Sequence, residues 1–229
     1  MRYIPILIII IIAILVYAMG WTNYLSLDEL NKHHVNLKSC IASHTILAPL
    51  IFIVIYIFLT MLALPIDTFL TLLGGYLFPE PYSLIYVTIG ASTGATCLFL
   101  AAKTAFGDLF FKWAGPFLKK MEKGFQENAA SYILFLRIIP IFPFWLANLS
   151  PAFFGVPLFT YYWATLVGVI PFAFVVTYAG AGLSVIMDAH QELTFEKIFN
   201  HNIKIALIGL GVLSLLPILY KHFFRNQQT

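Results

Sequence analysis

The charged residues of this chain are separated by stretches that are unusually long and apolar. Uncharged runs of 25, 28, 22 and 50 residues lie, in this order, between Arg2 and Asp28, Lys38 and Asp67, Glu80 and Lys103, and Arg137 and Asp188. A further run of 16 residues lies between Lys204 and Lys221. Because a helix crosses the hydrocarbon core with about 20 mostly apolar residues, these runs predict segments that enter or cross a bilayer.

Composition excludes the other classes of protein. The chain is 61% hydrophobic and only 10% charged, whereas a soluble domain is about 25% charged. Disordered chains are rich in charge and poor in hydrophobic residues, so disorder is excluded as well. A transmembrane β-barrel needs alternating apolar and polar residues, and the run 6–15 does not alternate. We therefore expect an all-α integral membrane protein.

Proline residues interrupt two of the apolar runs. Pro65 follows the run 46–64, and Pro140, Pro143 and Pro151 interrupt the run that starts at Tyr132. Proline removes a backbone donor and clashes with the preceding turn. Broken backbone at membrane depth persists only where protein or a wet cavity covers it. We therefore predict two re-entrant helical hairpins, over 45–80 and 132–152.

The distribution of lysine predicts the orientation. The segment 103–123 carries five lysines, and the C-terminal tail adds Lys221 and Arg225. The positive-inside rule then places both termini and 103–131 in the cytoplasm. Four crossings, at about 4–22, 82–106, 157–181 and 203–221, would place all of these segments on the cytoplasmic side. The two hairpins would then enter from opposite faces, which is the inverted arrangement of many transporters.

These segments divide the chain into three regions. Residues 1–44 are expected to form a signal-anchor helix and an outer loop, with a cleaved signal peptide as the alternative. Residues 45–182 would form the core, and 183–229 an outer loop, a last crossing and a cytoplasmic tail. Within the core, 116–128 has an apolar face opposite a charged face, which is typical of an interface helix. The alternative there is a solvated connector.

Polar residues at membrane depth are the candidate functional residues, because burying them is costly. Asp67 follows Pro65, Arg137 precedes Pro140, and Asn148 lies on the exit limb of the second hairpin. We expect the two tips to meet, with Asp67 and Arg137 in one polar cavity. Arginine stays charged and can grip a phosphate or carboxylate in a bidentate way. The alternatives are a structural ion pair, and an Asn148 that satisfies free backbone.

Small residues suggest close helix packing. Gly90 and Gly94 form a GxxxG spacing, which favours internal packing here, with dimerisation as the alternative. Gly75 and Gly168 are candidates for the same role or for hinge motion. Lys103 is interpreted as a residue that reaches back to the interface.

Enzyme motifs are absent from the sequence: it contains no GxSxG, HExxH or CxxC. The histidines of the predicted outer loop offer too few ligands for a metal site. We therefore expect no enzymatic activity, no metal and no cofactor, with an intramembrane enzyme as a lesser alternative. A net charge of +3, with the lysines close to the membrane, does not favour nucleic-acid binding.

Two sequence blocks resemble the DedA superfamily, also called the SNARE-associated or VTT-domain proteins, and especially its Tvp-type branch. The stronger block is Leu136-Arg137-Ile138-Ile139-Pro140-Ile141-Phe142-Pro143-Phe144, followed by Asn148. The looser block includes Leu64, Pro65, Thr71, Gly75, Phe78, Gly90, Gly94, Phe99 and Ala102. The resemblance covers roughly residues 45–182.

This resemblance implies lipid translocation by a flippase or scramblase. Bacterial members are linked to recycling of undecaprenyl phosphate and to proton-dependent membrane homeostasis, and eukaryotic relatives to phospholipid scrambling. The implied partners are membrane lipids that carry a phosphate, and protons, in a bacterial cytoplasmic membrane. The alternatives are a proton-coupled transporter of ions or small solutes, and a structural membrane protein without transport. The sequence does not determine an oligomeric state.

Overall fold

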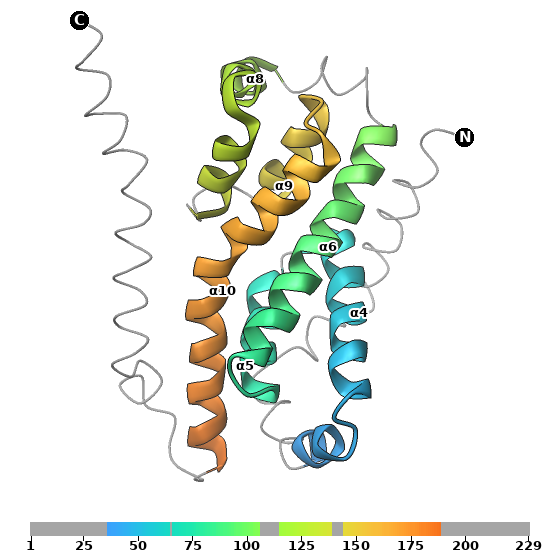
Figure 1. Cartoon of the computed structure of the whole chain (residues 1–229), viewed down its shortest axis with the longest axis vertical. Coiled ribbons are helices and arrows are strands. Elements are labelled where there is room, and N and C mark those ends of the chain that lie inside the picture. The colour runs from blue at the N-terminus through green and yellow to red at the C-terminus, as the bar shows by residue number, and fades with distance from the viewer. Residues whose placement is uncertain (1–35, 65, 106–114, 139–143, 189–229) are drawn as a thin grey trace, which may run out of the picture.

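The computed structural model describes residues 36–64, 66–105, 115–138 and 144–188, which form helices and turns without a strand. Its helices are Asn36–Ser43, α4 (Leu47–Met61), α5 (Asp67–Leu77), α6 (Tyr82–Ala105), α8 (Gly115–Ile138), α9 (Phe144–Phe153) and α10 (Leu158–Asp188) (Figure 1). The expected all-α class is confirmed. The predicted crossings 4–22 and 203–221, and the predicted breaks Pro65, Pro140 and Pro143, lie outside the described residues.

Two helices in the described ranges are long and apolar enough to cross a membrane. They are Tyr82–Thr104 and Leu158–Met187, which correspond to the expected crossings 82–106 and 157–181. Helix α10 is longer than expected and continues past the predicted start of an outer loop at 183. The reason is that neither a charge nor a proline follows Pro171 until Asp188.

Helices α4 and α5 form an antiparallel pair at one end of the bundle. Tyr56 contacts Asp67 and Thr71, while Phe52, one turn earlier, stacks edge-on against Phe78 at 5.3 Å. With 15 and 11 residues, each helix is shorter than a full span needs. The chain therefore reverses direction as predicted for the hairpin 45–80, and the position of this pair in a bilayer stays a prediction.

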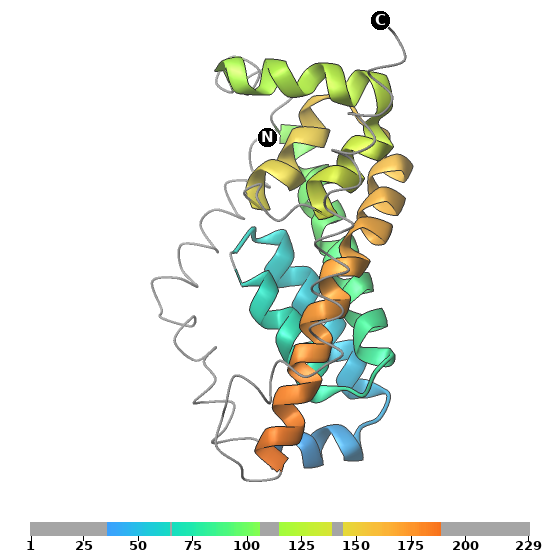
Figure 2. The same cartoon turned by 90° about the vertical axis from the view of Figure 1, so that its left-hand side faces the viewer.

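Helices α8 and α9 form a second antiparallel pair at the opposite end. Asn128 has non-helical backbone angles (φ −157°, ψ 83°) and divides α8 into two parts. The first part lies across the end of the bundle, and the second runs into it (Figure 2). The Asn128 side chain accepts a hydrogen bond from the Ser131 backbone N–H at 3.1 Å, which caps the second part. The prediction of a break at Pro151 is wrong, because α9 includes it and ends at Phe153.

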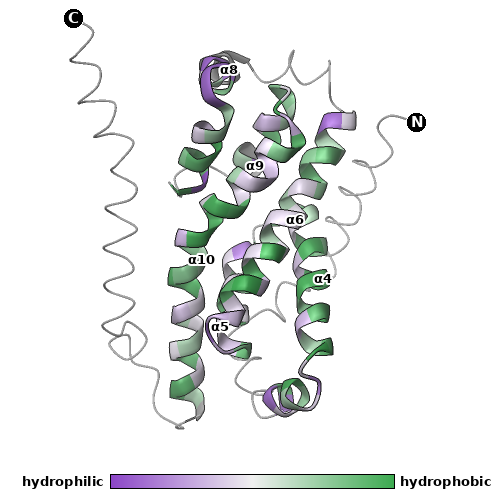
Figure 3. Ribbon diagram, in the orientation of Figure 1, coloured by the Kyte–Doolittle hydropathy of each residue, from purple (hydrophilic) through white to green (hydrophobic). Residues whose placement is uncertain are grey.

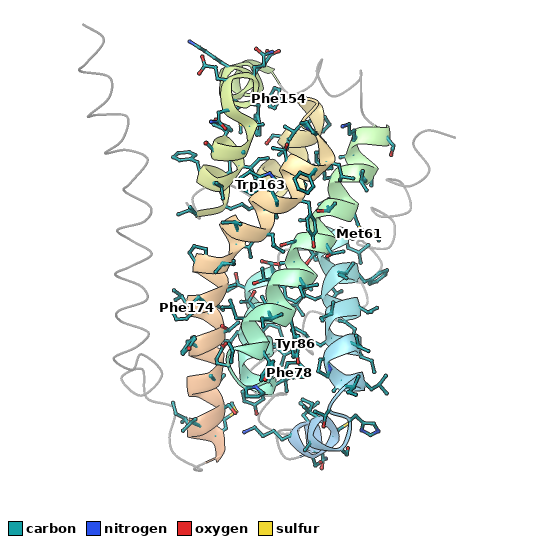
Figure 4. All side chains as sticks on the ribbon, viewed as in Figure 1. Met61, Phe78, Tyr86, Phe154, Trp163 and Phe174 are labelled. Atoms are coloured by element: carbon teal, nitrogen blue, oxygen red, sulfur yellow. The ribbon has the colours of Figure 1, made fainter. Side chains whose placement is uncertain are left out.

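The bundle has an apolar middle and polar ends (Figure 3). Large apolar side chains of α4, α6 and α10 are exposed around the middle, among them Val54, Ile55, Phe58, Ile85, Leu100, Phe159, Trp163 and Phe174. Trp163 and Phe174 of α10 are partly exposed, and Phe78 and Tyr86 lie in the half of the bundle that contains α4 and α5 (Figure 4). An exposed apolar belt of this kind suits a lipid environment.

Glycines set the closest helix contacts. Added Cβ atoms at Gly90 and Gly94 would lie 2.9 Å from Tyr56 Cβ and 2.7 Å from Thr60 Cβ, so this face of α6 packs against α4. A Cβ at Gly75 would overlap the Thr177 carbonyl, which shows that α5 and α10 touch backbone to backbone. The GxxxG face is therefore used for packing inside the chain, as small residues allow.

Candidate functional site

The Arg137 guanidinium lies at the inner end of α8, among oxygens from two other helices. Its Nη2 donates to the side-chain oxygens of Asn148 at 2.7 Å, Tyr161 at 2.9 Å and Thr165 at 3.5 Å. Asn148 belongs to α9, and the other two residues belong to α10. Three segments that are distant in sequence therefore position one cation.

The local sequence explains this arrangement. Tyr161, Thr165 and Gly168 are spaced at i, i+4 and i+7, so they share one face of α10. Gly168 leaves room for Arg137, because a Cβ there would lie 2.8 Å from Arg137 Cβ. Asn148 is fully buried and belongs to α9, the helix that follows α8 and Arg137 in the described chain.

Tyr161 connects this group to α6. Its ring stacks on Phe99 at 4.3 Å with an interplanar angle of 12°. Its hydroxyl accepts from Arg137 and lies 3.0 Å from Asn148 Oδ1 and 3.3 Å from the Ala95 carbonyl oxygen. The position of the guanidinium thus depends on a buried ring held between two membrane-length helices.

Among the described residues, the charge of Arg137 has no acidic partner in direct contact. All three of its side-chain partners are neutral oxygens. Its Nε is buried and has no hydrogen-bond partner in the described part of the chain. Because even a half-buried cation is costly without an anion, this environment favours an anionic ligand.

Asp67 forms a second polar group, at the start of α5. The Tyr56 hydroxyl donates to Asp67 Oδ1 at 2.9 Å, and the Thr71 hydroxyl donates to the Asp67 carbonyl oxygen at 2.8 Å. The carboxylate lies in the first turn of α5, where the helix dipole favours negative charge. Asp67 is therefore held by neutral donors.

The structure keeps Asp67 and Arg137 in separate hydrogen-bonded groups. Each has its own hydrogen-bond partners, and neither pairs with the other within the ranges that the structure describes. The alternative of a structural ion pair therefore has no direct contact to support it. The charge of Arg137 still lies within electrostatic range of Asp67. The two helix pairs thus place the two charges near each other without joining them, and a shared cavity stays a prediction.

Tyr56, Tyr161 and Thr165 of these groups were not identified from the sequence, and Thr71 was named only as part of the family resemblance. Each is a hydroxyl-bearing residue in a helix, and such residues are common in membrane helices without a special role. Their spacing was the available indication, because Tyr161 and Thr165, like Asp67 and Thr71, are four residues apart.

Lys103 and Glu80 are two further charged residues close to the bundle. Lys103 donates to the Val156 carbonyl oxygen at 3.3 Å and lies 5.6 Å from the centre of the Phe99 ring, so it folds back onto the protein. Both carboxylate oxygens of Glu80 are buried without a hydrogen-bond partner among the described residues. No group of three metal-binding side chains occurs among the described residues.

These observations define a multi-pass helical membrane protein in which two opposed helix pairs carry an acid and a guanidinium into an apolar bundle. Comparison with known sequences agrees with this class. Residues 64–182 match the VTT domain, which covers more than half of the chain. The chain belongs to the VTT-domain family, within the DedA superfamily.

The curated relatives include transmembrane proteins of animals. The chain is 32% identical over 177 residues to the Transmembrane protein 41 homolog of Caenorhabditis elegans, covering 74% of this chain and 68% of that protein. It is 31% identical over 170 residues to human Transmembrane protein 41B, covering 72% of this chain and 56% of the human protein. No solved structure matches. Placement in the Tvp-type branch stays a prediction.

Proposed function

We propose that this protein moves phosphate-bearing lipids between the two leaflets of a membrane. The observation that carries the proposal is the environment of Arg137, a half-buried guanidinium held by neutral oxygens, whose buried Nε has no hydrogen-bond partner among the described residues. A guanidinium binds phosphate through paired, charge-assisted hydrogen bonds. Undecaprenyl phosphate and phospholipids both present that group, and the family resemblance implies lipids of this kind.

Asp67 supplies a means of coupling in this proposal. A phosphate bound at Arg137 would place negative charge near Asp67, whose own partners Tyr56 and Thr71 are neutral. Phosphate binding and proton binding would then influence each other, because linkage between two sites is reciprocal. Transport would follow if the lipid stabilises one arrangement of the helix pairs over another.

The proposed setting is the bacterial cytoplasmic membrane, with both termini in the cytoplasm. The exposed apolar residues of α4, α6 and α10 support the membrane setting. The lysine-rich segment that contains the first part of α8 supports its cytoplasmic side. No enzymatic step is needed, because moving a lipid between leaflets changes no covalent bond.

The test is lipid transfer in liposomes that contain the purified full-length protein. A fluorescent phospholipid and a polyprenyl phosphate are followed separately as they become accessible to a membrane-impermeant quencher. We expect transfer to be faster than in empty liposomes. Arg137→Ala should slow it at least about tenfold, because hydrogen bonds to charged groups contribute about 1.5–3 kcal/mol each. Arg137→Lys should retain part of the activity, since lysine keeps the charge but loses the bidentate geometry.

Lys123→Ala is the matched control. Lys123 is exposed on the first part of α8, where it pairs with Glu127 at 3.7 Å, far along the helix from Arg137. Its loss should leave transfer unchanged.

The lipid proposal is contradicted if no headgroup moves faster than in empty liposomes. Proton flux that depends on a solute but not on headgroup would indicate a solute transporter. Folded Asp67→Asn and Arg137→Ala variants that fully complement a deletion strain would indicate a structural role.

A further inference from the structure

One face of α6 contacts Tyr161 and the turn that precedes it. Ala95, Phe99 and Lys103 are spaced at i, i+4 and i+8, so they share this face. The Ala95 carbonyl oxygen lies 3.3 Å from the Tyr161 hydroxyl, and the Phe99 ring stacks on the Tyr161 ring at 4.3 Å. Lys103 is the third member of this row, and it reaches the turn itself.

The turn between α9 and α10 is fixed by backbone hydrogen bonds. Just beyond the end of α9, Gly155 has a positive φ of 69°, and the Val156 N–H donates to the Pro151 carbonyl oxygen at 3.1 Å. These are the features of a Schellman motif, which ends a helix. The Pro157 carbonyl oxygen then accepts from the Tyr161 N–H at 3.0 Å. Val156 therefore joins the end of one helix to the first turn of the next.

Lys103 holds Val156 from the side of α6. Its Nζ donates to the Val156 carbonyl oxygen at 3.3 Å and lies 5.6 Å from the centre of the Phe99 ring. A cation is favoured near the C-terminal end of a helix, because the carbonyl groups there carry partial negative charge. The ring adds a cation–π attraction. Both backbone groups of Val156 are thus hydrogen-bonded, one to α9 and the other to α6.

The position of this turn affects two of the oxygens that hold Arg137. Asn148 lies on the helix before the turn, and Tyr161 lies in the first turn of the helix after it. Their side-chain oxygens are 3.0 Å apart, and both accept from the Arg137 Nη2. Because hydrogen bonds weaken steeply with distance and angle, a shift of the turn would leave the guanidinium held by fewer oxygens.

We propose that Lys103 is a positioning residue for Arg137. In this role it contacts no ligand. It holds the turn between α9 and α10, so that Asn148 and Tyr161 orient the guanidinium to bind a lipid phosphate. This differs from the interpretation based on sequence, in which Lys103 only reaches back to the interface. The proposal rests on the lipid function proposed above, but the hold on the turn can be measured without transport.

Hydrogen–deuterium exchange of the full-length protein in detergent measures this hold. Lys103→Met keeps the apolar stem and removes the donor. We expect exchange in peptides covering 150–162 to become about fivefold faster, as for the loss of one partly exposed hydrogen bond. Lys103→Arg should keep exchange slow, and peptides of α4 should not change in either variant. Lys123→Met is the matched control, because it removes an exposed lysine that pairs with Glu127 instead.

Lipid transfer in liposomes tests whether the turn acts on Arg137. Lys103→Met should slow transfer about fivefold, whereas Lys103→Arg should retain it. In a Tyr161→Phe background, Lys103→Met should slow transfer by only about twofold or less, because the hydroxyl through which the turn acts is already missing. A residue that stabilised only the fold would have the same effect in both backgrounds.

Three results would overturn the proposal. The first is unchanged exchange in 150–162 for Lys103→Met, and the second is faster exchange with unchanged transfer. The third is a full fivefold loss of transfer in the Tyr161→Phe background, which would indicate direct contact between Lys103 and lipid.

Failure of the transport function is a separate outcome. If the wild-type protein moves no lipid, that function is contradicted, while the exchange measurement still decides whether Lys103 holds the turn. Gel filtration shows whether each variant is folded. Lys103→Gln, which is also uncharged, replaces Lys103→Met in both measurements if Lys103→Met does not fold.

Discussion

Arg137 illustrates how a cation is accommodated in an apolar bundle without a carboxylate beside it. Its Nη2 donates to Asn148, Tyr161 and Thr165, while its Nε has no partner in the described residues. The hydroxyl and amide oxygens orient the guanidinium and leave its charge available. Tyr161 is the most constrained of them, because its ring is also stacked on Phe99.

Tyr161→Phe should therefore weaken the protein and its transport together. The change keeps the ring stacked but removes the hydroxyl that accepts from Arg137 at 2.9 Å. We expect a loss of about 1.5–3 kcal/mol in the free energy of unfolding, the usual range for a hydrogen bond to a charged group. Lipid transfer in liposomes should fall as the guanidinium loses its orientation. Tyr162→Phe is the control, because the adjacent side chain points away from the Arg137 face of α10. Equal effects of the two variants would refute this positioning role.

At the scale of elements, the contact between α5 and α10 depends on missing side chains. Gly75 and Gly180 allow backbone contact between the two helices. This contact holds the short α5 against a helix long enough to cross the membrane. Because lipid offers no hydrophobic drive for helices to associate, such close packing supplies much of the attraction.

Gly75→Ala should separate these helices. The added Cβ would overlap backbone atoms of Thr177, which cannot rotate away as a side chain can. We expect a loss of about 3 kcal/mol or more in the free energy of unfolding, at the upper end for overpacking. Gly155→Ala is the comparison, because no atom lies within 4 Å of its added Cβ, although its φ of +69° is strained for alanine. That variant should lose only about 1–2 kcal/mol. Thermal unfolding in detergent measures both, and a smaller loss for Gly75→Ala would contradict the packing account.

The packing partner of the GxxxG face of α6 is also decided by how the helices are arranged. Gly90 and Gly94 lie against Tyr56, Ile57 and Thr60 of α4. That surface is covered within the chain, so it is not available for a second copy. The sequence allowed both uses, and the choice depends on where α4 lies.

At the scale of the whole molecule, two polar ends flank an apolar belt. The first part of α8 lies across one end, and the helix Asn36–Ser43 lies across the other (Figures 1 and 2). Met121 and Phe125 are buried, while Lys123, Gln126 and Glu127 are exposed, which agrees with the amphipathic pattern predicted for 116–128. Two surface helices at opposite ends would each mark one membrane interface.

Labelling with a membrane-impermeant maleimide tests this arrangement. Cys40 is exposed on Asn36–Ser43 and should react from outside intact cells that express a Cys97→Ala variant. A Gln126→Cys variant without Cys40 and Cys97 should react only after the membrane is opened. Labelling of both positions from the same side would contradict the predicted topology. A Cys97-only variant is the control, because that residue lies in the middle of α6 and should react poorly from either side.

The charge pattern was sufficient to predict helices in a membrane, because backbone in lipid has few other ways to satisfy its hydrogen bonds. Uncharged runs placed α6 and α10, and prolines indicated reversals near 65 and 140. These features depend on local sequence and on the solvent alone. Pro151 was misread because a packed helix tolerates a proline near its end.

Which polar residues meet could not be read in the same way. Arg137, Asn148 and Tyr161 come from three helices, and their contacts depend on the rotation and crossing of each helix. Sequence spacing defines a face of one helix but not the face that it meets. The cost of charge in lipid indicated Asp67 and Arg137 as candidates, and their separate hydrogen-bond partners follow from how α5 and α8 pack. The local sequence thus indicated the membrane environment and the candidate polar residues. Long-range packing determined which residues contact them, because contacts between distant segments form only when the chain folds.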